Sequence, residues 1–115
     1  MSGRSARLLA AIALAAAPYA PAVAGDDNTV EAGRAIVEER CAACHAIGVS
    51  GESSHPQAPA FRTLSENYPV EDLAEALAEG IAVGHPDMPE LVATPEEIEA
   101  IIAHLRSIQN PAASD

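Results

Sequence analysis

The sequence predicts an all-α protein built from three main helices. Its apolar residues recur at steps of three and four, which is the pattern of a helix that buries one side. No segment alternates apolar and polar residues for long enough to form a β-strand. Glycines and prolines cluster between the periodic segments, and polar capping residues mark where the helices begin.

The first helix is predicted to begin near Asn28 and to end around Cys41. Asn28 and Glu31 have the spacing of a capping box, in which each side chain bonds to the backbone N–H of the other residue. The apolar stripe of this helix consists of Ala32, Ile36 and Val37.

The second helix is predicted after Pro69 and stops at Gly80, a residue type that commonly ends helices. Its apolar face is formed by Leu73, Ala74, Leu77 and Ile81. The flanking segments are predicted to be irregular. Residues 48–59 are rich in glycine, serine and proline, and two prolines exclude regular structure from residues 84–89.

The last helix has the clearest start signal in the chain. Thr94 supplies a capping hydroxyl, Pro95 occupies the first helical position and Glu97 the third. The stripe that follows consists of Ile98, Ile101, Ile102, Leu105 and Ile108. Its regular spacing predicts an amphipathic helix that faces the core.

The N-terminus has the features of a secretory signal peptide. Arg4 and Arg7 precede an apolar stretch at residues 8–17, and the Ala-Val-Ala segment ending at Ala24 offers the small residues that signal peptidase accepts. The apolar stretch is too short to cross a bilayer, which takes about 20 residues, and no other run of that length follows. We therefore expect export to the periplasm with cleavage near Ala24.

The expected domain organisation follows from this cleavage. Residues 1–24 form the signal peptide, and residues 25–115 form a single domain without a membrane span.

The charge of the chain is strongly negative. Six arginines and no lysine stand against 17 acidic residues, and the formal net charge is −11. Loss of Arg4 and Arg7 with the signal peptide makes the mature chain more acidic still. Nucleic acid and anionic membranes are therefore not expected as partners. A protein with a basic or apolar docking face is the expected kind of partner.

Residues 41–45 read Cys-Ala-Ala-Cys-His, which is the C-x-x-C-H signature for attachment of a c-type haem. Two thiols one helical turn apart can add to the two vinyl groups of a haem, which forms thioether bonds at Cys41 and Cys44. The adjacent His45 then lies beneath the iron and can bind it as the proximal ligand. The expected cofactor is one covalent haem c.

The composition supports a bound porphyrin. Aromatic residues make up 3% of the chain and tryptophan is absent, so a domain of this size would struggle to fill a core unaided. A buried porphyrin would fill that deficit. An exported protein with two cysteines could instead hold a disulfide, but a bridge between Cys41 and Cys44 closes a very short loop and stabilises little.

The second axial ligand of the iron is expected to be Met88. Once Met1 is removed, Met88 is the only methionine, and it lies in a proline-flanked segment between two helices. A thioether opposite a histidine raises the reduction potential of haem iron relative to two histidines. The alternative is that Met88 fills the core, and the irregular segment argues against it.

Three other histidines are weaker candidates for the iron. His85 is close to Met88 and could bind if the segment rearranged, whereas His55 lies in the polar loop. His55 and His85 are expected to be solvated, and His104 is expected to take part in a contact of the last helix.

These features resemble the class I c-type cytochromes, over nearly all of residues 25–109. The resemblance implies the cytochrome c fold, in which three main helices wrap around one covalently bound haem. In that family a glycine eight residues before the first cysteine, here Gly33, lets the last helix cross the first closely. The closing helix of the family is matched by residues 101–105.

The same resemblance implies roles for residues around the haem. Pro59 looks like the family's proline, whose carbonyl orients the proximal histidine through its second ring nitrogen, and Phe61 would pack against the haem edge. Met88-Pro89 matches the Met-Pro of the ligand loop. Two features depart from the family: an imidazole, His104, replaces the usual aromatic residue, and the lysine ring that guides mitochondrial-type cytochromes is absent.

The expected function is that of an exported, single-haem electron carrier with redox protein partners. It is not expected to be an enzyme, because two protein ligands leave the iron no open position for oxygen or peroxide. Arg62 and Tyr68 are candidates for binding the haem propionates. The electron donor, the acceptor and the oligomeric state are left open.

Three other functions are alternatives. The chain could be a cytochrome subunit of a periplasmic dehydrogenase or oxidase complex. It could be a haem sensor or weak peroxidase, which requires that Met88 is displaced. A thiol–disulfide protein using Cys41 and Cys44 ranks last, because the βαβ pattern of thioredoxin-like folds is absent from the sequence.

Overall fold

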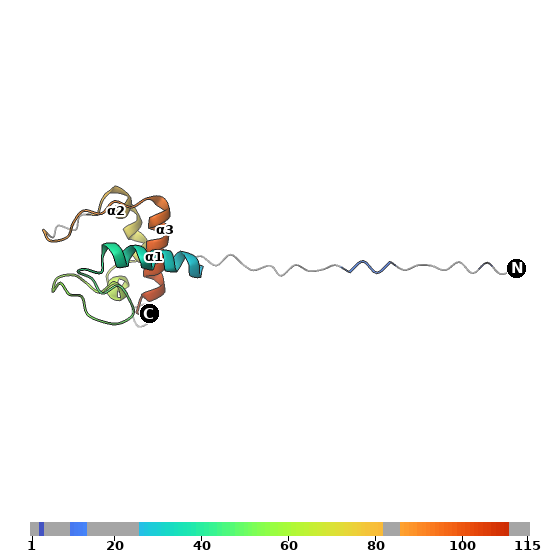
Figure 1. Ribbon diagram of the computed structural model, residues 1–115, viewed down its shortest axis with the longest axis horizontal. Coiled ribbons are helices and arrows are strands. Elements are labelled where there is room, and N and C mark those ends of the chain that lie inside the picture. The colour runs from blue at the N-terminus through green and yellow to red at the C-terminus, as the bar shows by residue number, and fades with distance from the viewer. Residues whose placement is uncertain (1–2, 4–9, 14–25, 82–85, 111–115) are drawn as a thin grey trace.

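The computed structural model describes residues 3, 10–13, 26–81 and 86–110 (Figure 1). Its α-helices are α1 (Asp27–Arg40), α2 (Leu73–Glu79) and α3 (Pro95–Ile108), and its 3₁₀ helices are η1 (Phe61–Glu66) and η2 (Val70–Asp72). The described ranges contain no β-strand, so the all-α prediction is confirmed. The expected cleavage site after Ala24 lies outside the described residues.

The start of α1 differs from the prediction. Asp26, not Asn28, is the N-cap, and its Oδ1 accepts a hydrogen bond of 2.8 Å from the Thr29 N–H. Asp26 has the extended backbone that a cap requires, with ψ of 159°, whereas Asn28 is already helical. The helix ends at Arg40 with Cys41 as its C-cap, as predicted.

The buried side of α1 also differs from the predicted stripe. Gly33 and Val37 are buried and Ile36 is partly buried, but Ala32 is exposed. The prediction was wrong for Ala32 because the glycine beside it, which carries no side chain, is the residue that faces α3.

The contact between α1 and α3 depends on Gly33. A Cβ atom at this position would overlap the carbonyl oxygen of Ala100 and lie 2.9 Å from the Cβ of His104. The two helices cross at this point (Figure 1). The close approach that the resemblance implied for Gly33 is confirmed.

The start of α3 is confirmed in detail. The Thr94 hydroxyl accepts a hydrogen bond of 3.2 Å from the Glu97 N–H, and the Glu97 carboxylate accepts one of 2.9 Å from the Thr94 N–H. Together with Pro95 in the first turn, this is a complete capping box. α3 packs against α1, α2, η1 and η2, and it is the central element of the domain.

The end of α2 lies at Gly80, as predicted, where a φ of 102° places the backbone in the left-handed region that favours glycine. Ile81 was predicted on the face of this helix, but it lies beyond the helix end. Its N–H donates a 3.0 Å hydrogen bond to the Leu91 carbonyl, in an isolated antiparallel bridge. The bridge joins the two ends of the segment that contains Met88.

The core draws on every helix. Its buried members are Val37, Leu64, Val70, Leu77, Ile81, Ala93, Ile101, Ile102 and Leu105. Two of them, Leu64 and Val70, come from the 3₁₀ helices. The sequence pattern did not predict η1, which is too short to show a period, and η2 occupies the first residues of the helix predicted after Pro69, so that α2 itself begins only at Leu73. Within the described ranges, no helix combines the length and the hydropathy needed to cross a bilayer.

Candidate functional site

The turn that follows α1 carries both cysteines and His45. The N–H groups of Cys41 and Ala42 donate to the Val37 carbonyl at 2.8 and 3.0 Å, which closes the helix. The N–H groups of Cys44 and His45 then donate to the Cys41 carbonyl at 3.2 and 2.9 Å. This tight turn brings the two thiols and the imidazole to the wall of one cavity.

The His45 imidazole is held from behind by a backbone carbonyl. Its Nδ1 lies 2.8 Å from the carbonyl oxygen of Pro59. A carbonyl can only accept, so Nδ1 carries the proton and Nε2 keeps its lone pair. This is the hydrogen bond that the family resemblance implied, and it leaves Nε2 able to bind a metal ion.

Phe61 lies against the same imidazole. The centroids of the two rings are 4.7 Å apart and their planes are tilted by 34°. The Phe61 N–H donates a 2.9 Å hydrogen bond to the Ala46 carbonyl, which ties the Pro59–Phe61 segment to the chain beside His45. Together these contacts restrict the rotation of the imidazole.

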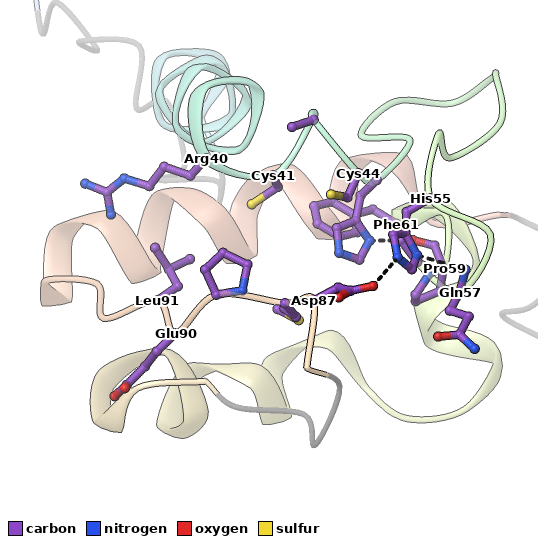
Figure 2. A pocket seen from close by; sticks show the side chains of 15 residues that line it. Arg40, Cys41, Cys44, His55, Gln57, Pro59, Phe61, Asp87, Glu90 and Leu91 are labelled. Carbon is purple, nitrogen blue, oxygen red and sulfur yellow. Dashed lines mark hydrogen bonds and ion pairs between the residues drawn. The ribbon is translucent and has the colours of Figure 1, made fainter.

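Two adjoining cavities, each of about 210 Å³, lie beside this turn. The outer cavity is bounded on one side by Cys41 and Cys44 and on the other by Asp87, Glu90 and Leu91 (Figure 2). The inner cavity reaches into the core and has apolar walls. Both cavities are lined by Cys41, His45, Pro59, Phe61, Met88 and Leu91.

Met88 is half-buried and lines the same two cavities as His45. It therefore packs at the edge of the core and also faces open space, unlike a methionine that only fills the core. The turn at residues 86–88 presents it, as the proline-flanked sequence suggested.

These residues fit a covalent haem. The apolar walls suit the porphyrin, the two thiols line the outer cavity where thioether bonds would form, and an imidazole and a thioether border the same space. Cys41 and Cys44 would hold the group, and His45 and Met88 are the side chains of the right chemistry to bind its iron.

The thiol of Cys41 is poorly suited to redox exchange. Burial raises its pKa to about 11, and the nearby Arg40 lowers it by less than burial raises it. A thiol with such a pKa stays protonated at neutral pH, whereas the reactive cysteine of a thiol–disulfide protein has a lowered pKa. This observation argues against the thiol–disulfide alternative.

His104 has the structural role that was expected. It is 3% exposed, and its Nε2 donates a 2.7 Å hydrogen bond to the carbonyl of Ile47, two residues after His45. It thus joins α3 to the loop behind the proximal histidine. His85 lies outside the described residues.

His55 is not simply solvated, and that expectation was wrong. Its Nε2 lies 3.1 Å from Oδ2 of Asp87, and both residues line the outer cavity (Figure 2). The loop that carries His55 folds back over the cavity because the His55 N–H bonds to the Cys44 carbonyl at 3.2 Å.

The two candidates for the haem propionates differ in position. Tyr68 lines the inner cavity, and burial raises the pKa of its hydroxyl. Arg62 lines neither of these cavities, but its Nη1 is buried without a hydrogen-bond partner among the described residues, and so is Oγ of Ser65 one turn later. A buried guanidinium nitrogen without an acceptor is costly, which fits an anionic group such as a carboxylate.

The sequence did not mark Asp87 and Arg40 as site residues. Both line the outer cavity, and Arg40 also forms a 2.9 Å ion pair with Glu97 at the start of α3. Asp87 directly precedes Met88 and Arg40 directly precedes Cys41, so their place in the sequence could have marked them as site residues. The pairing of Asp87 with His55 had no such signal, because it depends on how two loops meet.

Comparison with known proteins identified one family. The family model described as Cytochrome c matches residues 30–109, which run from the first turn of α1 to just beyond the end of α3. No curated protein and no solved structure matched the chain significantly.

Proposed function

Because the chain belongs to the cytochrome c family, which binds haem c covalently and transfers electrons, we propose that it is a periplasmic electron carrier with a single haem. The single haem is inferred from the one C-x-x-C-H run, and the periplasm from the signal-like N-terminus. The carrier is not an enzyme in this proposal.

The observation that carries the proposal is the common cavity of His45 and Met88. Both side chains border the two cavities that adjoin the cysteines. The Pro59 carbonyl accepts a hydrogen bond from the Nδ1–H of His45 and so directs the Nε2 lone pair to the iron as a stronger donor. Met88 would contribute a soft sulfur ligand, which favours the reduced state of haem iron relative to a second histidine.

When bound, the haem supplies an iron that alternates between Fe(II) and Fe(III). His45 and Met88 would both hold the iron through this change and so would limit the access of water and small ligands to it. Phe61 and the apolar residues of the inner cavity would exclude water from the faces of the haem that they contact.

The proposed partner is another redox protein, with a basic or apolar docking face. Three of the four described arginines already pair with glutamates: Arg34 with Glu31, Arg40 with Glu97 and Arg106 with Glu71. Since the chain has 17 acidic residues and six arginines, negative charge remains in excess, and the surface attracts a positively charged partner.

The test is an absorption spectrum of the holoprotein in both redox states, after export from a host with haem-attachment machinery. We expect a c-type reduced spectrum and a weak far-red band of the ferric protein that reports sulfur ligation. The Met88→Ala variant should lose that band, while the control Val92→Ala, four residues away and exposed, should keep it.

Other outcomes would reject parts of this proposal. A c-type spectrum without the far-red band would mean that Met88 does not bind the iron, and it would favour a sensor or peroxidase with an open site. Absence of covalent haem would contradict the roles of Cys41 and Cys44. Co-purification with a larger catalytic protein would favour the subunit alternative.

A further inference from the structure

Two loops far apart in the sequence meet at the outer cavity. One is the loop after the haem-attachment motif, which carries His55, and the other is the segment 86–90, which carries Met88. The link between them is the contact of 3.1 Å between the His55 Nε2 and the Asp87 Oδ2 (Figure 2). Asp87 directly precedes Met88 in the chain.

The hydrogen bonds of His55 indicate which of its ring nitrogens accepts and which donates. The Gln57 N–H donates to Nδ1 at 3.1 Å, so Nδ1 must be the acceptor. Nε2 then carries the proton and donates it to the Asp87 carboxylate. Both ring nitrogens thus have a partner, and the link to the Asp87 carboxylate is a charge-assisted hydrogen bond.

The two side chains of this link differ in their exposure to solvent. The His55 side chain is 25% exposed and that of Asp87 is 66% exposed. The imidazole is thus held within the loop, while the carboxylate reaches it from the other side of the cavity.

The other end of the segment is anchored separately. The Leu91 carbonyl accepts from the Ile81 N–H at 3.0 Å, and the Ala93 N–H donates to the Leu77 carbonyl at 2.9 Å. Met88 therefore lies between a backbone anchor after it and the side-chain contact of Asp87 before it.

From this geometry, and on the basis of the proposed axial role of Met88, we propose that His55 is a positioning residue for the iron site. By holding Asp87, it closes the outer cavity and keeps the Met88 sulfur against the iron. Loss of the hydrogen bond frees the segment, Met88 leaves the iron more often, and external ligands replace it faster.

The test uses the ferric holoprotein and imidazole as the external ligand, followed by stopped-flow loss of the far-red band. At saturating imidazole the rate is limited by departure of Met88. Removal of one hydrogen bond in His55→Ala or Asp87→Ala should raise this rate about fivefold. Asp87→Asn keeps an oxygen that accepts from the His55 Nε2–H but loses the charge, so its rate should lie between those of the wild type and Asp87→Ala.

Two controls separate this effect from a general loss of stability. Asp72→Ala removes an exposed carboxylate that makes no capping hydrogen bond and lines neither cavity, and its rate should equal that of the wild type. The double variant His55→Ala/Asp87→Ala should be no faster than either single variant, because both remove the same interaction.

Each contrary outcome overturns the proposal. A His55→Ala rate equal to that of the wild type would show that the contact does not hold Met88. Additive effects in the double variant, or an Asp87→Asn rate equal to that of Asp87→Ala, would exclude the hydrogen bond as the cause. A wild-type protein without the far-red band would instead contradict the axial role of Met88 itself.

Discussion

Single atoms at Gly33 and His104 determine how α1 lies on α3. The missing Cβ of Gly33 leaves room for the Ala100 carbonyl, and the neighbouring His104 uses its Nε2 to bind the Ile47 carbonyl at 2.7 Å. An aromatic residue is usual in the family at this position. Here the imidazole of His104 packs beside Gly33 and also forms a hydrogen bond to the loop behind His45.

A methyl group at Gly33 should separate these helices. Although alanine favours a helix by about 1 kcal/mol over glycine, the overlap with Ala100 should dominate, and we expect Gly33→Ala to lower the free energy of unfolding by about 2 kcal/mol. Urea denaturation of the ferric holoprotein measures this change in the free energy of unfolding. Gly48→Ala is the matched control, since a Cβ atom at Gly48 would meet no described neighbour within 4 Å. Equal stability of the two variants would contradict the close crossing.

At the level of elements, polar caps decide where helices begin. Thr94 and Glu97 form the reciprocal pair that the sequence predicted for α3. For α1 the sequence analysis predicted Asn28 as the cap, and the structure contradicts this. The structure selects Asp26, whose carboxylate accepts the Thr29 N–H, and this hydrogen bond lowers the pKa of the Asp26 carboxyl below 3.8.

This cap should contribute stability in a defined pH range. Because the pKa of Asp26 is lower in the folded protein than the usual 3.8, its contribution is complete above that pH and is lost as the pH falls through the lowered value. We expect Asp26→Ala to lower the melting temperature at neutral pH, with a difference from the wild type that shrinks well below pH 3.8.

The same measurement separates the observed cap from the predicted one. Asn28→Ala should leave the melting temperature nearly unchanged at every pH, because Asn28 is the second residue of the helix and does not cap it. A larger loss for Asn28→Ala than for Asp26→Ala would contradict the structure and support the cap predicted from the sequence.

On the scale of the whole molecule, the core is arranged around the cavities. The inner cavity is lined by α1, η1, α2 and α3, through residues such as Val37, Leu64, Leu77 and Leu105. Without a group that fills this space of about 210 Å³, its apolar lining would have no packing partner, which costs on the order of several kcal/mol. This is comparable to the entire stability of many small domains.

Without haem, the helical fold should therefore be lost or greatly weakened. We expect the Cys41→Ser/Cys44→Ser variant, which cannot form thioether bonds, to have much less helical circular dichroism than the wild type. Met88→Ala, which keeps both thioethers, is the control and should remain helical. A haem-free variant with wild-type helicity and cooperative unfolding would show that the protein core is sufficient alone.

Much of this protein was predictable from local patterns. The capping box of α3, the stop at Gly80 and the irregular segment around Met88 depend on neighbouring residues, so a sequence reveals them. The C-x-x-C-H run carries its chemistry within five positions, and the Cytochrome c family match over residues 30–109 agrees with it. The hydrogen bond between His45 and Pro59 was expected through the resemblance rather than from spacing.

What the tertiary structure alone decided are contacts between distant segments. The pairing of His55 with Asp87, the bridge from Ile81 to Leu91 and the unpaired Arg62 nitrogen of the described chain depend on how loops and helices meet. The sequence by itself determined the all-α class, the haem-attachment motif and the acidic charge, because these follow from residue types and short spacings. The shape of the site depended on tertiary packing. A loop has no regular sequence pattern, so its own residues do not show which distant segment it will contact.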